Sequence, residues 1–226
     1  MLSGLWDLLF PRVCLGCGQV LTHHEVVICL SCEVRLPRSG FEGVAPNPIE
    51  QVFGGRLPLE AGHSSFVFRG GSTLRRLLHQ LKYHNHPEVG YYLGELLGRD
   101  LLSQEKFAGL DMVLAVPMHP AKEVLRGYNQ AQLIAEGVGK SLGIPAPAGV
   151  LVKGRATESQ TRKRRFERWK NVEGGFGLSD ASAVSGKGVL LVDDVVTTGA
   201  TLEACAQVLV QGSANRLCLA TVACTW

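Results

Sequence analysis

The stretch that most constrains the fold of this chain is residues 188–204, GVLLVDDVVTTGATLEA. Its first part, Gly188 to Val192, is a short apolar run rich in branched residues, which is typical of a buried strand of a parallel sheet. We expect Asp193 and Asp194 to end this strand. After a Thr/Gly loop, apolar residues recur at helical spacing: Leu202, Cys205, Ala206 and Leu209. A strand, a polar loop and a helix N-terminus in this order present backbone N–H groups and hydroxyls to an anion such as phosphate.

A bound phosphate does not explain why two adjacent carboxylates lie beside it. Sugar hydroxyls, with a divalent cation nearby, would explain them. The segment VLLVDDVVTTGAT resembles the phosphoribosyl-pyrophosphate (PRPP) motif of type I phosphoribosyltransferases. This resemblance implies that the acids contact the ribose hydroxyls, that the loop holds the 5′-phosphate, and that magnesium accompanies PRPP. The residues it places at PRPP are Asp193, Asp194, Val195, Val196, Thr197, Thr198, Gly199, Ala200 and Thr201. The alternative is an ordinary βα turn with N-capping threonines.

Composition narrows the class of protein. The 226 residues suit one sizeable domain and a small module, and a net charge of +3 is too small by itself to imply nucleic-acid binding. No apolar run approaches the roughly 20 residues of a transmembrane helix. The first residues, MLSGLWDLLF, lack the basic start and long apolar core of a signal peptide and predict a short amphipathic helix. We therefore expect a cytoplasmic protein with no membrane insertion.

Four of the seven cysteines form two CxxC pairs near the N-terminus, Cys14/Cys17 and Cys29/Cys32. Each pair places two thiolates on one tight turn, and two such turns complete a tetrahedron around zinc. A closed site of four thiolates has no open position, so we expect structural zinc. A redox dithiol is the alternative, but two pairs in register favour the metal. A segment this short needs the metal for much of its folding free energy.

The Pro/Gly-rich residues 41–60 predict a linker between a zinc-binding module, residues 1–40, and a large domain, residues 61–226. Apolar runs in that domain predict strands at residues 63–70, 112–116 and 217–223. Periodicity predicts a helix at residues 72–83, with Ser72 as its N-terminal cap, and a second helix at residues 87–102. We expect Arg75 and Arg76 on a solvated helix face, and Cys205, Cys218 and Cys224 in the core. Alternating strands and helices predict an α/β, type I phosphoribosyltransferase-like parallel sheet with helices on both faces and ligand at the carboxyl ends of the strands.

Three further segments supply candidate site residues. In type I phosphoribosyltransferases the loop after the strand at 112–116 binds pyrophosphate, which implies Pro117, Met118 and His119, although a βα turn punctuated by prolines is equally compatible. The motif RGYNQ, residues 126–130, and the LKY segment that contains Lys82 resemble the ComF/GntX-like family. Arg126 is suited to pairing with phosphate oxygens, and Tyr128 to stacking on a base or ribose. The alternative for this motif is a capped loop with a buried tyrosine.

Residues 153–171, KGRATESQTRKRRFERWKN, hold eight basic side chains against two acidic ones. Aromatic residues among arginines suit stacking on nucleic-acid bases with contacts to backbone phosphates. They also suit a lid over a polyphosphate, and a solvated helix whose aromatic residues pack on the domain is the third possibility. The nucleic-acid candidates are Arg162, Lys163, Arg164, Arg165, Phe166, Arg168 and Trp169. The T-x-x-Q spacing of Thr157 and Gln160 also resembles the ComF family.

The resemblance to the ComF/GntX-like family thus covers nearly the whole chain, and it implies PRPP binding and a link to natural transformation and incoming single-stranded DNA. Two functions follow. The first is an enzyme that transfers phosphoribose from PRPP to an acceptor and releases pyrophosphate; the sequence offers no general base, so its catalytic residue and acceptor stay unknown. The second is a non-catalytic module that binds single-stranded DNA or a partner, such as another DNA-uptake protein, and keeps the PRPP pocket as a sensor.

Overall fold

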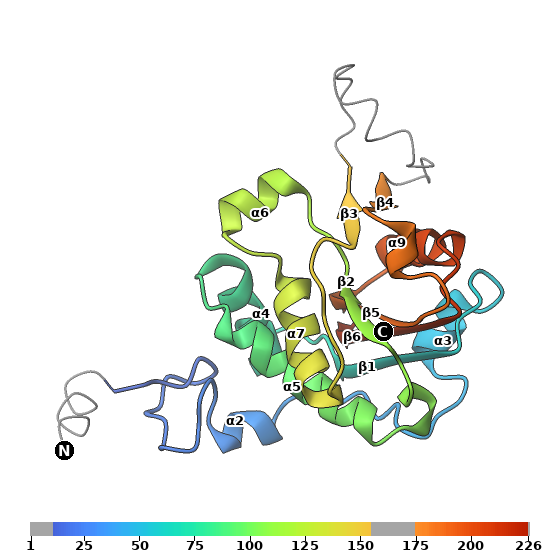
Figure 1. Cartoon of the computed structure of the whole chain (residues 1–226). Coiled ribbons are helices and arrows are strands. Elements are labelled where there is room, and N and C mark those ends of the chain that lie inside the picture. Colours follow the sequence, from blue (N-terminus) through green and yellow to red (C-terminus); the bar gives the residue numbers. More distant parts are fainter. Residues whose placement is uncertain (1–10, 155–174, 226) are drawn as a thin grey trace.

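The computed structural model describes residues 11–154 and 175–225, in which a small N-terminal segment lies against an α/β body (Figure 1). The body is built on a parallel sheet with the strand order β1-β6-β5-β2. Its strands are β1 (Ala61–Val67), β2 (Met112–Ala115), β5 (Gly188–Val196) and β6 (Arg216–Cys224). The predicted class, a parallel sheet with helices, is confirmed. The predicted strands at 63–70, 112–116 and 217–223 correspond to β1, β2 and β6 within a few residues.

Strand β5 occupies an inner position of the sheet, between β6 and β2. Its apolar run is completely buried from Val189 to Val192, as expected for a strand covered on both faces. The prediction that the two acids end this strand was wrong. Strand β5 continues through Asp193 and Asp194 to Val196 because β6 runs beside it that far, with Asp193 opposite Thr221.

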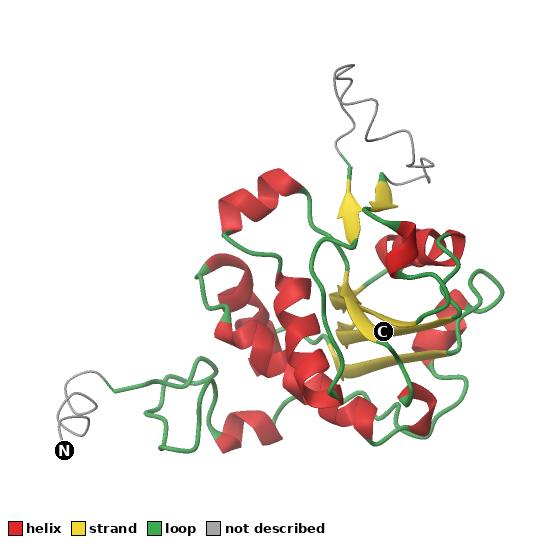
Figure 2. Cartoon of the chain, viewed as in Figure 1, coloured by secondary structure: helices red, strands yellow, loops and turns green. Residues whose placement is uncertain are grey.

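Helices cover both faces of the sheet (Figure 2). Helices α5 (Glu88–Leu102) and α7 (Gln130–Leu142) pack on one face, and α4 (Thr73–Tyr83) packs against α5. Helix α9 (Ala200–Gln211) covers the other face. Helices α5 and α7 approach closely because both carry glycine at their crossing. A Cβ on Gly94 would lie 2.2 Å from the Ile134 carbonyl oxygen, and one on Gly137 would lie 2.4 Å from that of Tyr91.

Residues 41–60, which the sequence predicts to be a linker, contain helix α3 (Pro48–Phe53). Asn47 and Glu50 form a capping box at its start, and the side chains of Ile49 and Phe53 are fully buried. Helix α3 packs on β1, and a Cβ on Gly62 would lie 2.7 Å from Ile49. The division into module, linker and domain stays a prediction.

The N-terminal segment contacts the helices of the body directly. It contains a bridge between Val13 and Val20 and helix α2 (Leu30–Val34). Arg75 and Arg76 are exposed, as expected for a solvated helix face, and the guanidinium of Arg76 also donates to the Gly16 carbonyl at 2.7 Å. The Tyr92 hydroxyl in α5 donates to the carboxylate of Glu33 at 2.6 Å. These bonds join the cysteine-rich segment to α4 and α5.

The remaining elements are short. They are α6 (Pro120–Arg126), the antiparallel pair β3 (Leu151–Lys153) and β4 (Phe176–Leu178), and the 3-10 turns η1 (Glu105–Phe107) and η3 (Ala181–Ala183). Cys205, Cys218 and Cys224 are fully buried, as expected. The helix expected at the N-terminus lies outside the described residues. Among the helices that the structure describes, none has the length and apolar character needed to cross a membrane.

Candidate functional site

The loop after β5 is shaped by one glycine. Gly199 has φ = +80° and is the N-cap of α9, and a Cβ there would meet the ring of Phe53 at 2.8 Å. Only glycine therefore lets the chain turn from the strand into the helix against α3. Residues of this loop line a hollow of about 50 Å³: Asp193, Val195, Val196, Thr197, Thr198, Gly199, Ala200, Thr201 and Leu202. The hollow sits at the N-terminus of a 12-residue helix, where backbone N–H groups and the helix dipole favour an anion.

The two acids differ in their surroundings. Asp194 Oδ2 lies 2.5 Å from Lys82 Nζ, so its charge is paired. For Asp193, burial and the neighbouring negative charge of Asp194 raise the pKa to about 8, although the Asp194 N–H and the Lys82 ammonium act in the other direction. Each carboxylate also accepts the N–H of the following residue, at 2.8 Å for Asp193 and 2.7 Å for Asp194. The pair can therefore hold a proton or attract a cation at this point of the sheet.

Lys82 reaches the acids from the last turn of α4, and Tyr128 supports that turn. The Tyr128 hydroxyl donates to the Leu81 carbonyl at 2.7 Å, one residue before Lys82. Ser72 caps the other end of α4 by accepting the Arg75 N–H, as its sequence predicts. Through this hydrogen bond, Tyr128 holds the helical turn that carries Lys82. Whether its ring also stacks on a ligand stays a prediction.

The loop after β2 borders a larger pocket of about 190 Å³. Pro117 and Met118 line this pocket, together with Asn129 and Lys153. The Asn129 amide donates to the Val116 carbonyl at 3.0 Å, and its oxygen accepts the Ala131 N–H to cap α7. Asn129 is not among the predicted site residues, although an asparagine directly before a helix is a signal for an N-cap. The pocket walls come from β2, β3 and the start of α7, which meet at one edge of the sheet.

Two other candidates are occupied with local contacts. The His119 ring accepts the Ala121 N–H at 3.2 Å and so caps α6. The guanidinium of Arg126 lies over the Tyr83 ring, 5.8 Å from its centre. A role for either residue at PRPP stays a prediction. The nucleic-acid candidates, Arg162, Lys163, Arg164, Arg165, Phe166, Arg168 and Trp169, lie outside the described residues.

The four N-terminal cysteines form a compact cluster. The Sγ atoms of Cys14, Cys17, Cys29 and Cys32 all lie within 4.8 Å of one another. Burial acts to raise the pKa of Cys14, but the N–H groups of Cys29, Cys17 and Gly16 lower it to about 6. N–H donors around a thiolate and four sulfur atoms at this spacing suit a tetrahedral metal ion. The cluster is compatible with structural zinc, which would hold the two turns of this segment together.

The sequence and the fold of the chain are similar to those of several named proteins. A model of the phosphoribosyl transferase domain matches residues 134–224. The DNA utilization protein YhgH of Salmonella typhi is 32% identical over 144 residues, 62% of this chain and 63% of that protein. The chain thus spans less than two thirds of this relative's length. Competence protein F of Haemophilus influenzae is 26% identical over 87% of this chain and 90% of its own length. A Bacillus subtilis glutamine PRPP amidotransferase structure covers 63% of this chain and 30% of its own at 22% identity, with a TM-score of 0.43.

The fold and the matched residues define the class: the chain carries a phosphoribosyltransferase domain on a parallel α/β sheet. Beyond that domain, the chain is similar to competence protein F and to YhgH, and it carries a cysteine cluster beside the domain. The family model covers β5, its acids and the Thr/Gly loop.

Proposed function

We propose that this chain is a cytoplasmic protein that binds PRPP with magnesium at the carboxyl ends of β5 and β2. In the proposed reaction it transfers phosphoribose to an acceptor with release of pyrophosphate, as part of DNA uptake. One observation carries the proposal: Lys82 Nζ lies 2.5 Å from Asp194, beside an anion-binding loop at the N-terminus of α9. Positive and negative groups thus meet where a ligand with both phosphates and hydroxyls needs them. The names of the relatives support the link to DNA uptake.

The site suggests a division of tasks. The N–H groups and hydroxyls of Thr197 to Thr201 would hold the 5′-phosphate, while Asp193 and Asp194 would accept hydrogen bonds from the ribose hydroxyls. Magnesium would neutralise charge on the pyrophosphate that leaves. Pro117 and Met118 border the pocket in which that group would lie. Positioning and charge stabilisation would then lower the barrier to breaking the bond at C1 of the ribose.

Calorimetry with PRPP and magnesium tests the binding. We expect saturable binding by the full chain, and a loss of at least tenfold in affinity for the double variant Asp193→Asn, Asp194→Asn. The matched control is Glu105→Gln, an exposed acid away from the loop. Equal affinity in the parent and the double variant would contradict the proposed site. A screen of nucleobases and other nucleophiles for pyrophosphate release then separates an enzyme from a sensor that only binds.

A second function, binding of single-stranded DNA, is favoured by the basic and aromatic residues of the segment 153–171. If this segment contacts DNA phosphates, replacing Arg162, Lys163, Arg164 and Arg165 with glutamine should flatten the salt dependence of DNA binding. The matched control replaces Arg35, Arg75, Lys122 and Lys187, which are exposed elsewhere. An equal change of salt slope in both variants would count against the segment. DNA binding that persists in the double aspartate variant would indicate that the two ligands use different surfaces.

A further inference from the structure

Three side chains that can bind a metal ion converge on the side of the body where the segment after α2 meets β1 and α5. They are Glu42, His63 of β1 and Asp100 of α5, and each offers a ligand atom within 4.8 Å of the other two. Strand β1 is separated from β5 by β6, so this cluster is distinct from the PRPP loop. The proposed function uses none of these residues.

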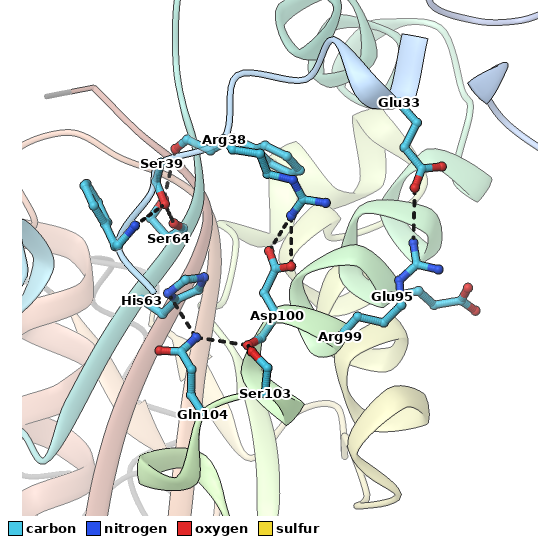
Figure 3. Close-up of polar contacts among 12 residues, drawn as sticks. Glu33, Arg38, Ser39, His63, Ser64, Glu95, Arg99, Asp100, Ser103 and Gln104 are labelled. Atoms are coloured by element: carbon cyan, nitrogen blue, oxygen red, sulfur yellow. Dashed lines mark hydrogen bonds and ion pairs between the residues drawn. The ribbon is translucent and has the colours of Figure 1, made fainter. Parts of the chain in front are cut away.

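His63 is the residue that needs an explanation. Its side chain is fully buried, and its Nε2 atom has no hydrogen-bond partner among the described residues. The other ring nitrogen, Nδ1, lies 3.3 Å from the Gln104 amide nitrogen. Figure 3 shows the ring between Gln104 and Asp100, with the unpartnered nitrogen on the side of the Asp100 carboxylate. A buried polar atom without a partner destabilises the folded chain unless a ligand satisfies it.

We propose that Glu42, His63 and Asp100 bind a divalent first-row cation such as Mn²⁺ or Zn²⁺. Imidazole nitrogen and carboxylate oxygen are ligands that such ions accept together. A neutral imidazole ring is the form in which histidine binds metals. Water would complete the coordination, since Glu42 is exposed and leaves the site open to solvent.

Arg38 orients one of the proposed metal ligands, Asp100. Its guanidinium donates to both oxygens of Asp100, at 2.8 Å and 2.7 Å (Figure 3). It also lies over the Phe66 ring, 4.9 Å from its centre. Carboxylates that bind metals are commonly held by such outer hydrogen bonds, which fix their orientation. With one cationic and two anionic side chains, the cluster carries a net charge of about −1, which favours a divalent cation.

Gln104 can complete the arrangement. When a histidine binds a metal through one nitrogen, it donates the other N–H to a nearby acceptor. The Oε1 atom of Gln104 is buried without a partner among the described residues. A half-turn of its amide would bring Oε1 opposite Nδ1 of His63, at the cost of the bond from Nε2 to the Asp100 carbonyl at 3.0 Å. Metal binding would then give partners to His63 Nε2 and Gln104 Oε1, two of the buried side-chain atoms that lack one among the described residues.

Titration of the full chain with Mn²⁺, followed by electron paramagnetic resonance of the free ion, tests this site. Mn²⁺ prefers oxygen and nitrogen ligands and does not compete for the four thiolates. We omit PRPP, and we expect the parent and Asp194→Asn to bind one Mn²⁺ more tightly than any other. Both Glu42→Gln and His63→Gln should weaken that binding by at least tenfold.

Glu88→Gln is the matched control, because Glu88 pairs with His86 at 2.6 Å on an exposed surface and should leave Mn²⁺ binding unchanged. His63→Gln alters a buried residue, so its folding is checked by circular dichroism. Glu42→Gln changes an exposed side chain and keeps the test decisive if the buried variant unfolds. Tight binding that survives Glu42→Gln, or that disappears in Asp194→Asn, would overturn the proposal.

Discussion

At the scale of single residues, the raised pKa of Asp193 makes the stability of the chain depend on pH. Its pKa rises from an ordinary 3.8 to about 8 in the folded chain, so folding binds a proton between these values. The stabilisation from this proton is complete below about pH 4 and is lost as the pH rises through about 8. We expect Asp193→Asn, which resembles the protonated acid, to raise the melting temperature relative to the parent at pH 8 and to raise it by less at pH 5. Thermal unfolding at both pH values measures the difference.

Asp194→Asn is the control for this prediction. It removes the negative charge that helps to raise the pKa of Asp193, so the loss of stability with pH should move to lower pH. An Asp193→Asn variant whose melting temperature follows that of the parent at every pH would contradict the raised pKa.

The sequence predicted these acids and their loop because strand, carboxylates and helix start lie within one continuous stretch. It could not predict that Lys82 pairs with Asp194, since more than a hundred residues separate them and only the packing of α4 brings them together. The burial of His63 was unpredictable for the same reason. Its neighbours Glu42 and Asp100 come from other parts of the chain.

At the scale of secondary-structure elements, the C-terminal end of α4 depends on one hydroxyl. Tyr128→Phe removes the donor to the Leu81 carbonyl and leaves the ring in place. We expect a loss of about 1 kcal/mol in the free energy of unfolding, as for an ordinary hydrogen bond. If Lys82 serves PRPP, the affinity for PRPP should fall as well, because the last turn of α4 loses its support. Chemical denaturation and calorimetry measure the two effects.

Tyr83→Phe is the matched control, since this tyrosine lies on the same turn and is 68% exposed. It should change neither quantity. A Tyr128→Phe variant that loses stability but keeps its PRPP affinity would show that the support of Lys82 is unimportant for the ligand.

Among the elements, the sequence predicted α4 and its Ser72 cap from periodicity and cap chemistry. It missed α3, because prolines and glycines around a six-residue helix resemble a linker, and only burial of Ile49 and Phe53 reveals its role.

At the scale of the whole molecule, polar contacts join the cysteine-rich segment to the α/β body, among them an ion pair of Arg99 with Glu33 at 3.6 Å. Arg76 binds the Gly16 carbonyl, and Tyr92 binds Glu33. We expect removal of metal by a chelator to unfold the N-terminal segment and leave the sheet folded, because β5 and β6 are inner strands covered by the helices of the body. Hydrogen exchange should then show lost protection at residues 14–36 and at the start of α4, with β5 unchanged. Cys17→Ser should reproduce the effect, and Cys205→Ala, a buried cysteine outside the cluster, should leave the protection of residues 14–36 intact. Protection that stays the same at residues 14–36 after complete removal of metal would show that packing alone holds the segment.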